Sequence, residues 1–270
     1  RPGRLVLGVQ TAKLGQVTTA MLLKLSPDAQ HRGFLPFAAA SARLAACLRG
    51  YAMHLKPLLL PIALLLISSA VHAEEDDDGV LNINGCRIEA DSQCPKADLR
   101  GVNLSNQDMR RMNLAGADLR GANLRHSNLD LANLENANLQ GANLTRSSLQ
   151  QSNLRLANFA DSTLVAINGW GLFAQGATFT NTDMRAANLE FARLSAAKMH
   201  NVNLTAADLE MTWLSKADLK GASLLSANLQ EVKMGGANLE NANLSDSRQL
   251  YGNYQGANMP GCKNCPPGWD

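Results

Sequence analysis

A five-residue pattern of apolar and polar positions runs along the chain from about Ala97 to Gly261. Every residue whose number ends in 4 or 9 is the central apolar residue of a unit, and Leu, Met or Phe fills nearly all of these positions from Leu99 to Leu244. A period of five fits neither an amphipathic helix nor a long half-buried strand. Two apolar residues two positions apart can instead face one side of a very short strand, with a polar residue between them facing the other side. The remaining two residues must then turn the chain, so repetition coils it into a tube.

The repeated unit reads Ala-Asn/Asp-Leu-x-x, as in residues 97–99, 117–119 and 122–124, and it resembles the pentapeptide-repeat family. The resemblance implies an all-β fold: a right-handed, four-sided β-helix solenoid in which four pentapeptides make a coil of twenty residues. Residues 97–261 would then form about eight coils, or a rod of about 40 Å at the usual strand spacing of ~4.8 Å.

One segment, residues 165–175, interrupts the pattern without changing its frame. Gly169 and Ala174 stand where large inward residues are expected. Either the coil narrows here, or the segment leaves the wall as a loop.

The front of the chain is unlike the repeats. Residues 53–73 combine a basic start, an apolar run, and small residues at Val71 and Ala73 before the acids that begin at Glu74, which are the parts of a secretory signal peptide. We predict cleavage between Ala73 and Glu74 and a periplasmic or secreted protein. The apolar run falls short of the ~20 residues that a spanning helix needs, so we expect membrane contact only through the uncleaved signal segment.

Residues 1–52 show no sustained periodicity and begin at Arg1. They are interpreted as an upstream extension outside the mature protein, with translation starting at Met53. The alternative is a genuine basic leader, with translation starting at or before Met21.

Four cysteines flank the repeats: Cys86 and Cys94 before them, and Cys262 and Cys265 after them. An even number in an exported protein indicates disulfides. Because the ends of the rod would lie about 40 Å apart, far beyond the ~7 Å Cα limit, we expect the local pairs Cys86–Cys94 and Cys262–Cys265. Zinc would need four ligands at one point, and a redox dithiol would need a strand-helix context that is missing here. Residues 74–96 are expected to form an acidic N-terminus and first cap, and residues 262–270 the last cap.

Outward positions can be compared at intervals of twenty residues. One such column is an asparagine ladder that gives way to aromatic and basic residues in the second half of the rod. A neighbouring corner adds further apolar residues, among them Leu131 and Tyr251. Exposed apolar patches often mark partner sites, although these side chains could also cover one another within the chain. The candidate partner surface consists of Trp170, Phe173, Phe191, Arg193, Met211, Trp213 and Lys233.

Candidate chemistry is sparse. His126 and His200 would lie on different sides of the rod, too far apart for a shared metal or an acid-base pair. There is no phosphate-binding Gly-rich loop, and the many Asp and Ser residues occupy turn positions. We therefore expect no enzymatic activity, no cofactor and no metal.

Charge distinguishes two functional interpretations. Some pentapeptide-repeat proteins protect DNA gyrase by imitating duplex DNA with a strongly acidic rod. Residues 97–261 carry fourteen acidic and fourteen basic residues, so the phosphate-like charge is missing and no nucleic-acid binding is expected. The sequence favours an exported, non-enzymatic scaffold that binds an unknown protein partner or a second copy of itself. The alternative is a cytoplasmic gyrase-protecting DNA mimic, if the signal peptide is not used.

Overall fold

The computed structural model describes residues 73–75 and 79–267. All of them belong to one compact unit, Leu65–Asp270. The predictions for residues 1–52 and 53–73 fall outside the described residues, apart from Ala73. No helix within the described part of the chain is long and apolar enough to span a bilayer.

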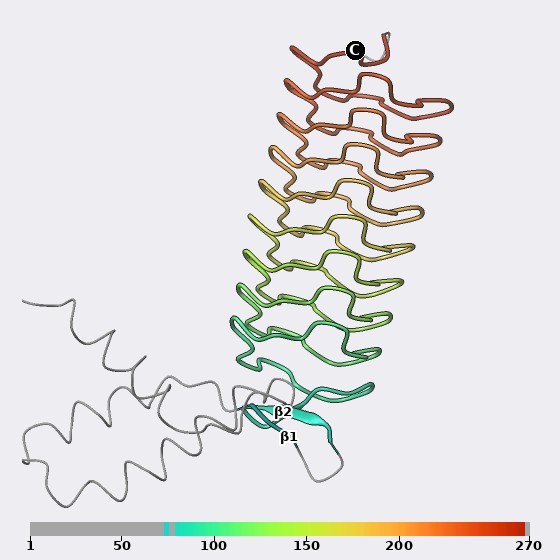
Figure 1. Ribbon diagram of the computed structural model, residues 1–270. Helices are drawn as coiled ribbons and strands as arrows, with labels where there is room; N and C mark the ends of the chain where they lie inside the picture. Colours follow the sequence, from blue (N-terminus) through green and yellow to red (C-terminus); the bar gives the residue numbers. More distant parts are fainter. Residues whose placement is uncertain (1–72, 76–78, 268–270) are drawn as a thin grey trace, which may run out of the picture. The chain divides into compact units, whose positions relative to one another are not determined.

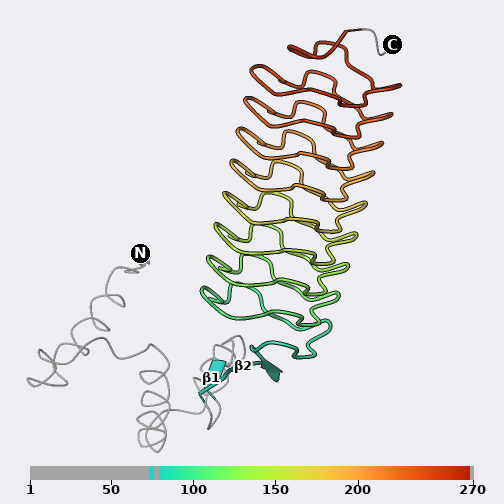
Figure 2. The same ribbon diagram turned by 90° about the vertical axis from the view of Figure 1, so that its right-hand side faces the viewer.

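Parallel bridges join residues that are twenty positions apart, from Gln93↔Asn113 to Asn243↔Lys263. Four bridge positions, five residues apart, follow one another along each coil, and each continues as a column through the stack. Figures 1 and 2 show these coils stacked along one axis. The described chain is thus a β-helix solenoid of roughly eight coils, with the twenty-residue coil expected from the sequence.

Backbone hydrogen bonds tie each coil to the next. The amide of Leu99 donates to the carbonyl oxygen of Asp118 at 2.8 Å, and the amide of Asp118 donates back to Ala97 at 2.9 Å. Between bridges the chain turns, and Gly101 adopts a left-handed φ of 63°. The Oδ1 atom of Asp98 accepts a bond from the Arg100 amide at 3.3 Å. Asn and Asp recur at this position because they satisfy a turn amide with a short polar side chain.

The interior contains the apolar positions that the pattern predicts. Residues ending in 4 or 9 are buried from Leu99 to Leu244. Phe159 and Phe179, twenty residues apart, stack with their ring centroids 5.1 Å apart. The residues that the sequence pattern predicts to face the interior are therefore the ones that do so in the structure.

The interruption at residues 165–175 stays in the wall and does not form a loop. Asn168 bridges to Ser148 and to Asn188, in register with the rest of its column. An added Cβ at Gly169 would lie 2.5 Å from Leu172 Cδ2 and 3.1 Å from Leu189 Cδ2. Leu172 occupies a position often held by Ala and is buried, so a small and a large residue have exchanged places around Gly169.

Three short strands precede the coils: β1 (Ala73–Glu75), β2 (Leu81–Ile83) and β3 (Cys86–Arg87). They form an antiparallel sheet in the order β1-β2-β3. Asn84 and Gly85, both with positive φ, connect β2 to β3, as the type I′ hairpin turn requires. The predicted cleavage site lies within β1, where Ala73 pairs with Ile83 and Glu74 pairs with Asn82.

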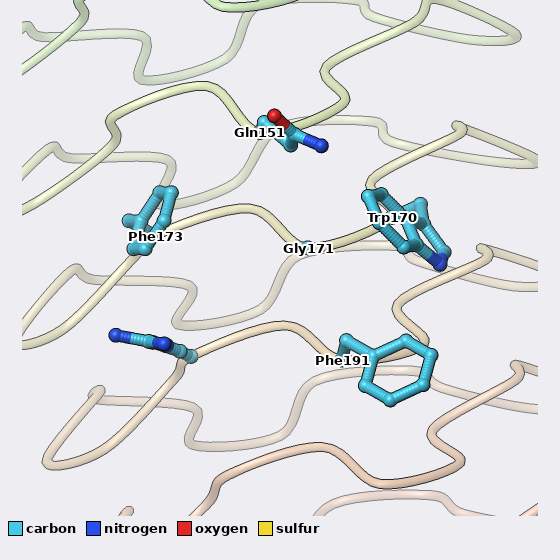
Figure 3. A pocket seen from close by; sticks show the side chains of 6 residues that line it. Gln151, Trp170, Gly171, Phe173 and Phe191 are labelled. Carbon is cyan, nitrogen blue, oxygen red and sulfur yellow. The ribbon is translucent and has the colours of Figure 1, made fainter.

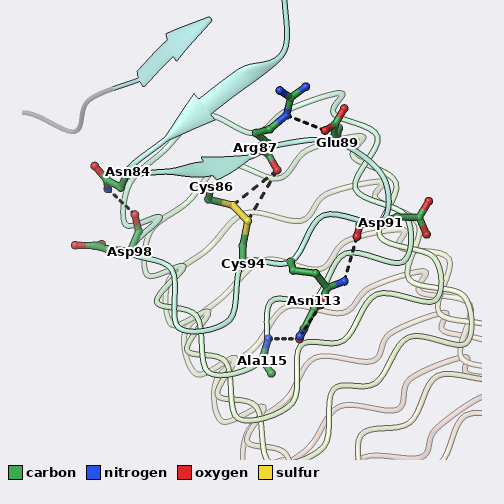
Figure 4. Close-up of a disulfide and its surroundings, with 10 residues drawn as sticks. Asn84, Cys86, Arg87, Glu89, Asp91, Cys94, Asp98, Asn113 and Ala115 are labelled. Atoms are coloured by element: carbon green, nitrogen blue, oxygen red, sulfur yellow. Dashed lines mark hydrogen bonds and ion pairs between the residues drawn. A yellow bond between two sulfur atoms is a disulfide. The ribbon is translucent and has the colours of Figure 1, made fainter. Parts of the chain in front are cut away.

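Both expected disulfides are present. Cys86 and Cys94 are bridged with their Cα atoms 5.5 Å apart, beside the β2–β3 hairpin (Figure 4). Ile83 and Ile88 are buried with these sulfurs in the same hydrophobic cluster as the first coil. At the other end, Cys262 is bridged to Cys265 with a Cα separation of 5.8 Å.

Candidate partner-binding surface

One side of the solenoid, here called the aromatic side, differs from the rest of its surface. It comprises the bridge column from Asn113 to Asn253 and the turns directly before and after each bridge residue in that column. In the described part of the chain, every large hydrophobic side chain that is exposed lies on this side. These side chains are Leu131, Leu156, Phe191, Trp213, Leu250 and Tyr251.

At the centre of the aromatic side, aromatic and basic residues alternate along the column. Phe173 bridges to Arg193, which bridges to Trp213. The Arg193 guanidinium carbon lies 5.2 Å from the Phe173 ring centroid and 6.0 Å from that of Trp213. Arg155 approaches Phe173 at 5.3 Å. Each exposed cation–π contact contributes about 0.5–1 kcal/mol, so the stack holds Arg193 extended along the surface between two rings.

A hollow of about 300 Å³ opens beside this stack. Figure 3 shows Trp170 and Phe191 on one side of it and Phe173 on the other, with Gly171 between them. Trp170 meets Phe191 edge-on, with centroids 5.8 Å apart and an interplanar angle of 70°. Gly171, which has no side chain, contributes only backbone to the lining. Gln151 and Arg193 complete its lining.

The structure brings together most of the predicted surface. Trp170 does cover part of Phe191, yet Phe191 remains 41% exposed and Trp213 remains 52% exposed. Covering within the chain therefore hides only part of the patch. Met211 and Lys233 lie on the same side and are half-buried.

Sequence reasoning missed four contributors: Arg155, Gln151, Leu156 and Leu250. Gln151 lines the hollow, and Arg155 lies over the Phe173 ring beside it. Leu156 and Leu250 are 60% and 59% exposed. Their signal was present in the sequence, because each lies in a turn next to the aromatic column. Comparing the turns on both sides of the column at intervals of twenty residues would have found Arg155 and Leu156, whereas Gln151 and Leu250 lie in the turn that precedes the column.

Ion pairs are concentrated in the first coils, away from this centre. Arg100 binds Asp98 at 2.6 Å, and Arg120 binds Asp118 at 2.6 Å. The hydrogen bond from Arg100 lowers the pKa of Asp98 to about 2. Among the described residues, no carboxylate forms an ion pair with Arg193, so its charge stays unneutralised.

A single histidine lies against a carboxylate among the described residues. His200 Nε2 contacts Asp218 Oδ2, and both side chains are substantially exposed. Burial raises the pKa of Asp218, but hydrogen bonds from His200 and the Lys220 amide bring it below the ordinary value. No group of three metal-ligating side chains comes together within residues 73–75 and 79–267. What this surface offers chemically is apolar area, planar cations and a shallow hollow.

Five-residue units wound into twenty-residue coils define a repeat solenoid. The family model for Pentapeptide repeats matches residues 97–136, 137–166, 175–210 and 212–246, in eight copies, which is more than half of the chain. The chain therefore belongs to the pentapeptide-repeat family. Most of the interruption falls in the gap between the second and third matched ranges.

Several solved structures are similar to the chain. HetL, a pentapeptide repeat protein involved in heterocyst differentiation regulation from the cyanobacterium Nostoc sp. strain PCC 7120, is 26% identical, over 64% of this chain and 83% of HetL, with a TM-score of 0.39. A pentapeptide repeat protein from the Arabidopsis thaliana thylakoid lumen is 27% identical, over 42% of this chain and 69% of its own, with a TM-score of 0.28. A trypsin-treated variant of QnrB1, a plasmid-mediated fluoroquinolone resistance protein, is 21% identical, over 64% of this chain and 87% of QnrB1, with a TM-score of 0.41. A search of curated proteins found no match.

Proposed function

We propose that this protein is an exported, non-enzymatic scaffold that binds another protein, or a second copy of itself, through the aromatic side. We further propose that its solenoid is the right-handed, four-sided β-helix of the family. The observation that carries the binding proposal is the segregation of every exposed large hydrophobic residue of the described chain onto one side. A chain that had no use for this surface would be expected to scatter such residues over all four sides.

Trp213 is the residue on which the proposal depends most. Its side chain is half-exposed and lies beside the Arg193 guanidinium. Tryptophans that become buried when a partner binds are frequent hot spots, with losses of about 2 kcal/mol or more on truncation. The DNA-mimic alternative gains no support here, because the rod has balanced charge and its exposed apolar residues are poor imitations of phosphate.

The binding test compares Trp213→Glu with a matched control, Ser223→Glu. Residue 223 occupies the same position of its unit on another side, bridging Asn203 and Asn243. Self-association of the intact protein would be measured by analytical ultracentrifugation. Partners would be sought by photo-crosslinking in periplasmic extract, then purified and titrated individually. We expect Trp213→Glu to weaken the complex about thirtyfold, while Ser223→Glu leaves it intact. A complex that tolerates Trp213→Glu would refute the proposed surface.

Export is tested separately by cell fractionation and N-terminal sequencing. A periplasmic chain that begins at Glu74 is expected. Intact protein confined to the cytoplasm would overturn export and would return the gyrase-protecting alternative to consideration.

A further inference from the structure

We infer that the aromatic side recognises a peptide segment in which a carboxylate lies next to a large apolar side chain. The carboxylate would bind Arg193, and the apolar side chain would enter the hollow between Trp170 and Phe173. This inference rests on the proposed function and specifies the chemistry of the partner.

Arg193 differs from the arginines that serve the fold. Arg100, Arg110, Arg120 and Arg185 each lie in a turn and bind the aspartate two residues earlier. Arg193 instead occupies a bridge position, is exposed, and has no ion-pair partner among the described residues. Its guanidinium is nevertheless positioned by two rings.

A guanidinium that is already ordered loses less side-chain entropy when it binds a ligand. The planar fork of Arg matches a carboxylate with two parallel hydrogen bonds. Arg155, on the Phe173 ring, and Lys233, one coil beyond Trp213, add positive charge to the same side. The charge of this column therefore selects an acidic group.

The size and openness of the hollow indicate a side chain rather than a free small molecule. Small-molecule sites usually bury 70–90% of the ligand in about 300–1,000 Å³. The hollow is at the lower limit of that range and is open on its outer side, and Figure 3 shows Trp170, Gly171 and Phe173 along it. A Phe, Leu or Trp side chain can lie against Trp170 and Phe191 while the rest of its chain continues along the rod.

Charges at the adjacent corner fix the direction of such a segment. Glu190 and Glu210 lie in the turns that precede Arg193 and Trp213, and Glu210 is held by a 3.1 Å hydrogen bond from Asn228. These carboxylates repel an acidic group on the corner. The carboxylate of the partner must consequently face the bridge column, with its apolar neighbour toward Trp170.

The test uses a phage library of random twelve-residue peptides, selected against the intact purified protein. Enriched peptides are expected to place Asp or Glu within two residues of Phe, Trp or Leu. The best peptide would be synthesised and titrated by fluorescence anisotropy. We expect Arg193→Gln to weaken its binding about tenfold or more, and Glu→Gln in the peptide to do the same.

A double-mutant cycle provides the sharpest evidence, because the peptide substitution should have little further effect on Arg193→Gln. The matched control is Arg125→Gln, an exposed arginine on another side without an ion-pair partner in the described chain. Circular dichroism and thermal melting should show that both variants fold like the wild type, since both side chains are exposed.

The remaining outcomes overturn the inference. They are failure to enrich any peptide, enrichment of acid-free peptides, binding that is unchanged in Arg193→Gln, and occupation of the hollow only by a second copy of the chain. Acid-free peptides whose binding is lost in Trp213→Glu would overturn this inference alone and would leave the proposed function standing. A partner complex insensitive to Trp213→Glu would remove both.

Discussion

The exchanged interior at Gly169 and Leu172 leads to a prediction about coupled substitutions. In most units a large residue occupies the position whose number ends in 4 or 9, and Ala or Ser follows three positions later. At Gly169 and Leu172 the order is small and then large. The double variant Gly169→Leu/Leu172→Ala would restore the usual order. Each single variant breaks the packing, and the two together should repair it.

The magnitudes follow from the local geometry. Leu172 is 1% exposed, so truncation to Ala removes fully buried carbons and should cost about 2–5 kcal/mol, including the cavity that remains. A Cβ at Gly169 already lies within 2.5 Å of Leu172 Cδ2, so Gly169→Leu alone overpacks the coil by about 1–3 kcal/mol. The φ of Gly169 is not in the left-handed region, so its backbone accepts a leucine.

The double variant conserves interior volume and should lie within about 1.5 kcal/mol of the wild type. Independent effects would instead add to about 3–8 kcal/mol. The coupling is therefore expected to be about 1.5 kcal/mol or more, in the upper half of the range for residues in contact. Guanidinium unfolding followed by circular dichroism, with the m-value checked in all four proteins, measures it. Additive losses, or a Leu172→Ala variant as stable as the wild type, would refute the exchanged packing.

Three further predictions concern the coils and caps. The Arg100 hydrogen bond lowers the pKa of Asp98 to about 2, so the stability that this pair contributes is present above pH ~4 and is lost as the pH falls toward 2. Thermal melting of Asp98→Asn should therefore show a smaller loss of stability in acid than the wild type, with a difference of less than about 1 kcal/mol. Breaking the N-terminal disulfide with Cys94→Ala should cost about 2–4 kcal/mol and increase hydrogen exchange in the first coil before later coils. Gly221→Ala should destabilise the protein more than Gly141→Ala. Both glycines have positive φ, but only a Cβ at residue 221 would meet another side chain, Asn201, at 2.5 Å. Equal melting temperatures of the two variants would contradict this prediction.

Much of the solenoid could be predicted from the sequence because its constraints are local and repeated. The inward residues, the coil length and both disulfides follow from the five-residue frame, the positions of the cysteines and the length of the rod. Cys86 and Cys94, for example, are separated from Cys262 and Cys265 by nearly the whole rod, so a disulfide could form only between the two cysteines at the same end. Stacking by twenty also placed Phe173, Arg193 and Trp213 in one column, where the structure has them.

Other features depended on side-chain contacts that a repeat frame does not contain. The frame could not decide whether residues 165–175 form a loop, because Leu172 compensates for Gly169 across a corner between two units. The repeat frame also could not show that Trp170 packs against Phe191 while Trp213 stays exposed, because side-chain rotamers decide where each tryptophan lies. Leu156 was overlooked because only one of the two turns beside the column was compared.

The absence of any insertion between Gln93 and Lys263 gives the chain a strict modularity. Duplication or removal of twenty residues would lengthen or shorten the rod by one coil and return every later residue to its own side. A change of five residues between Arg193 and Trp213 would instead rotate the distal part by one bridge position and separate Trp213 from Phe173 and Arg193. Rod length is therefore free to vary in evolution or design, whereas the surface is preserved only by changes in whole coils.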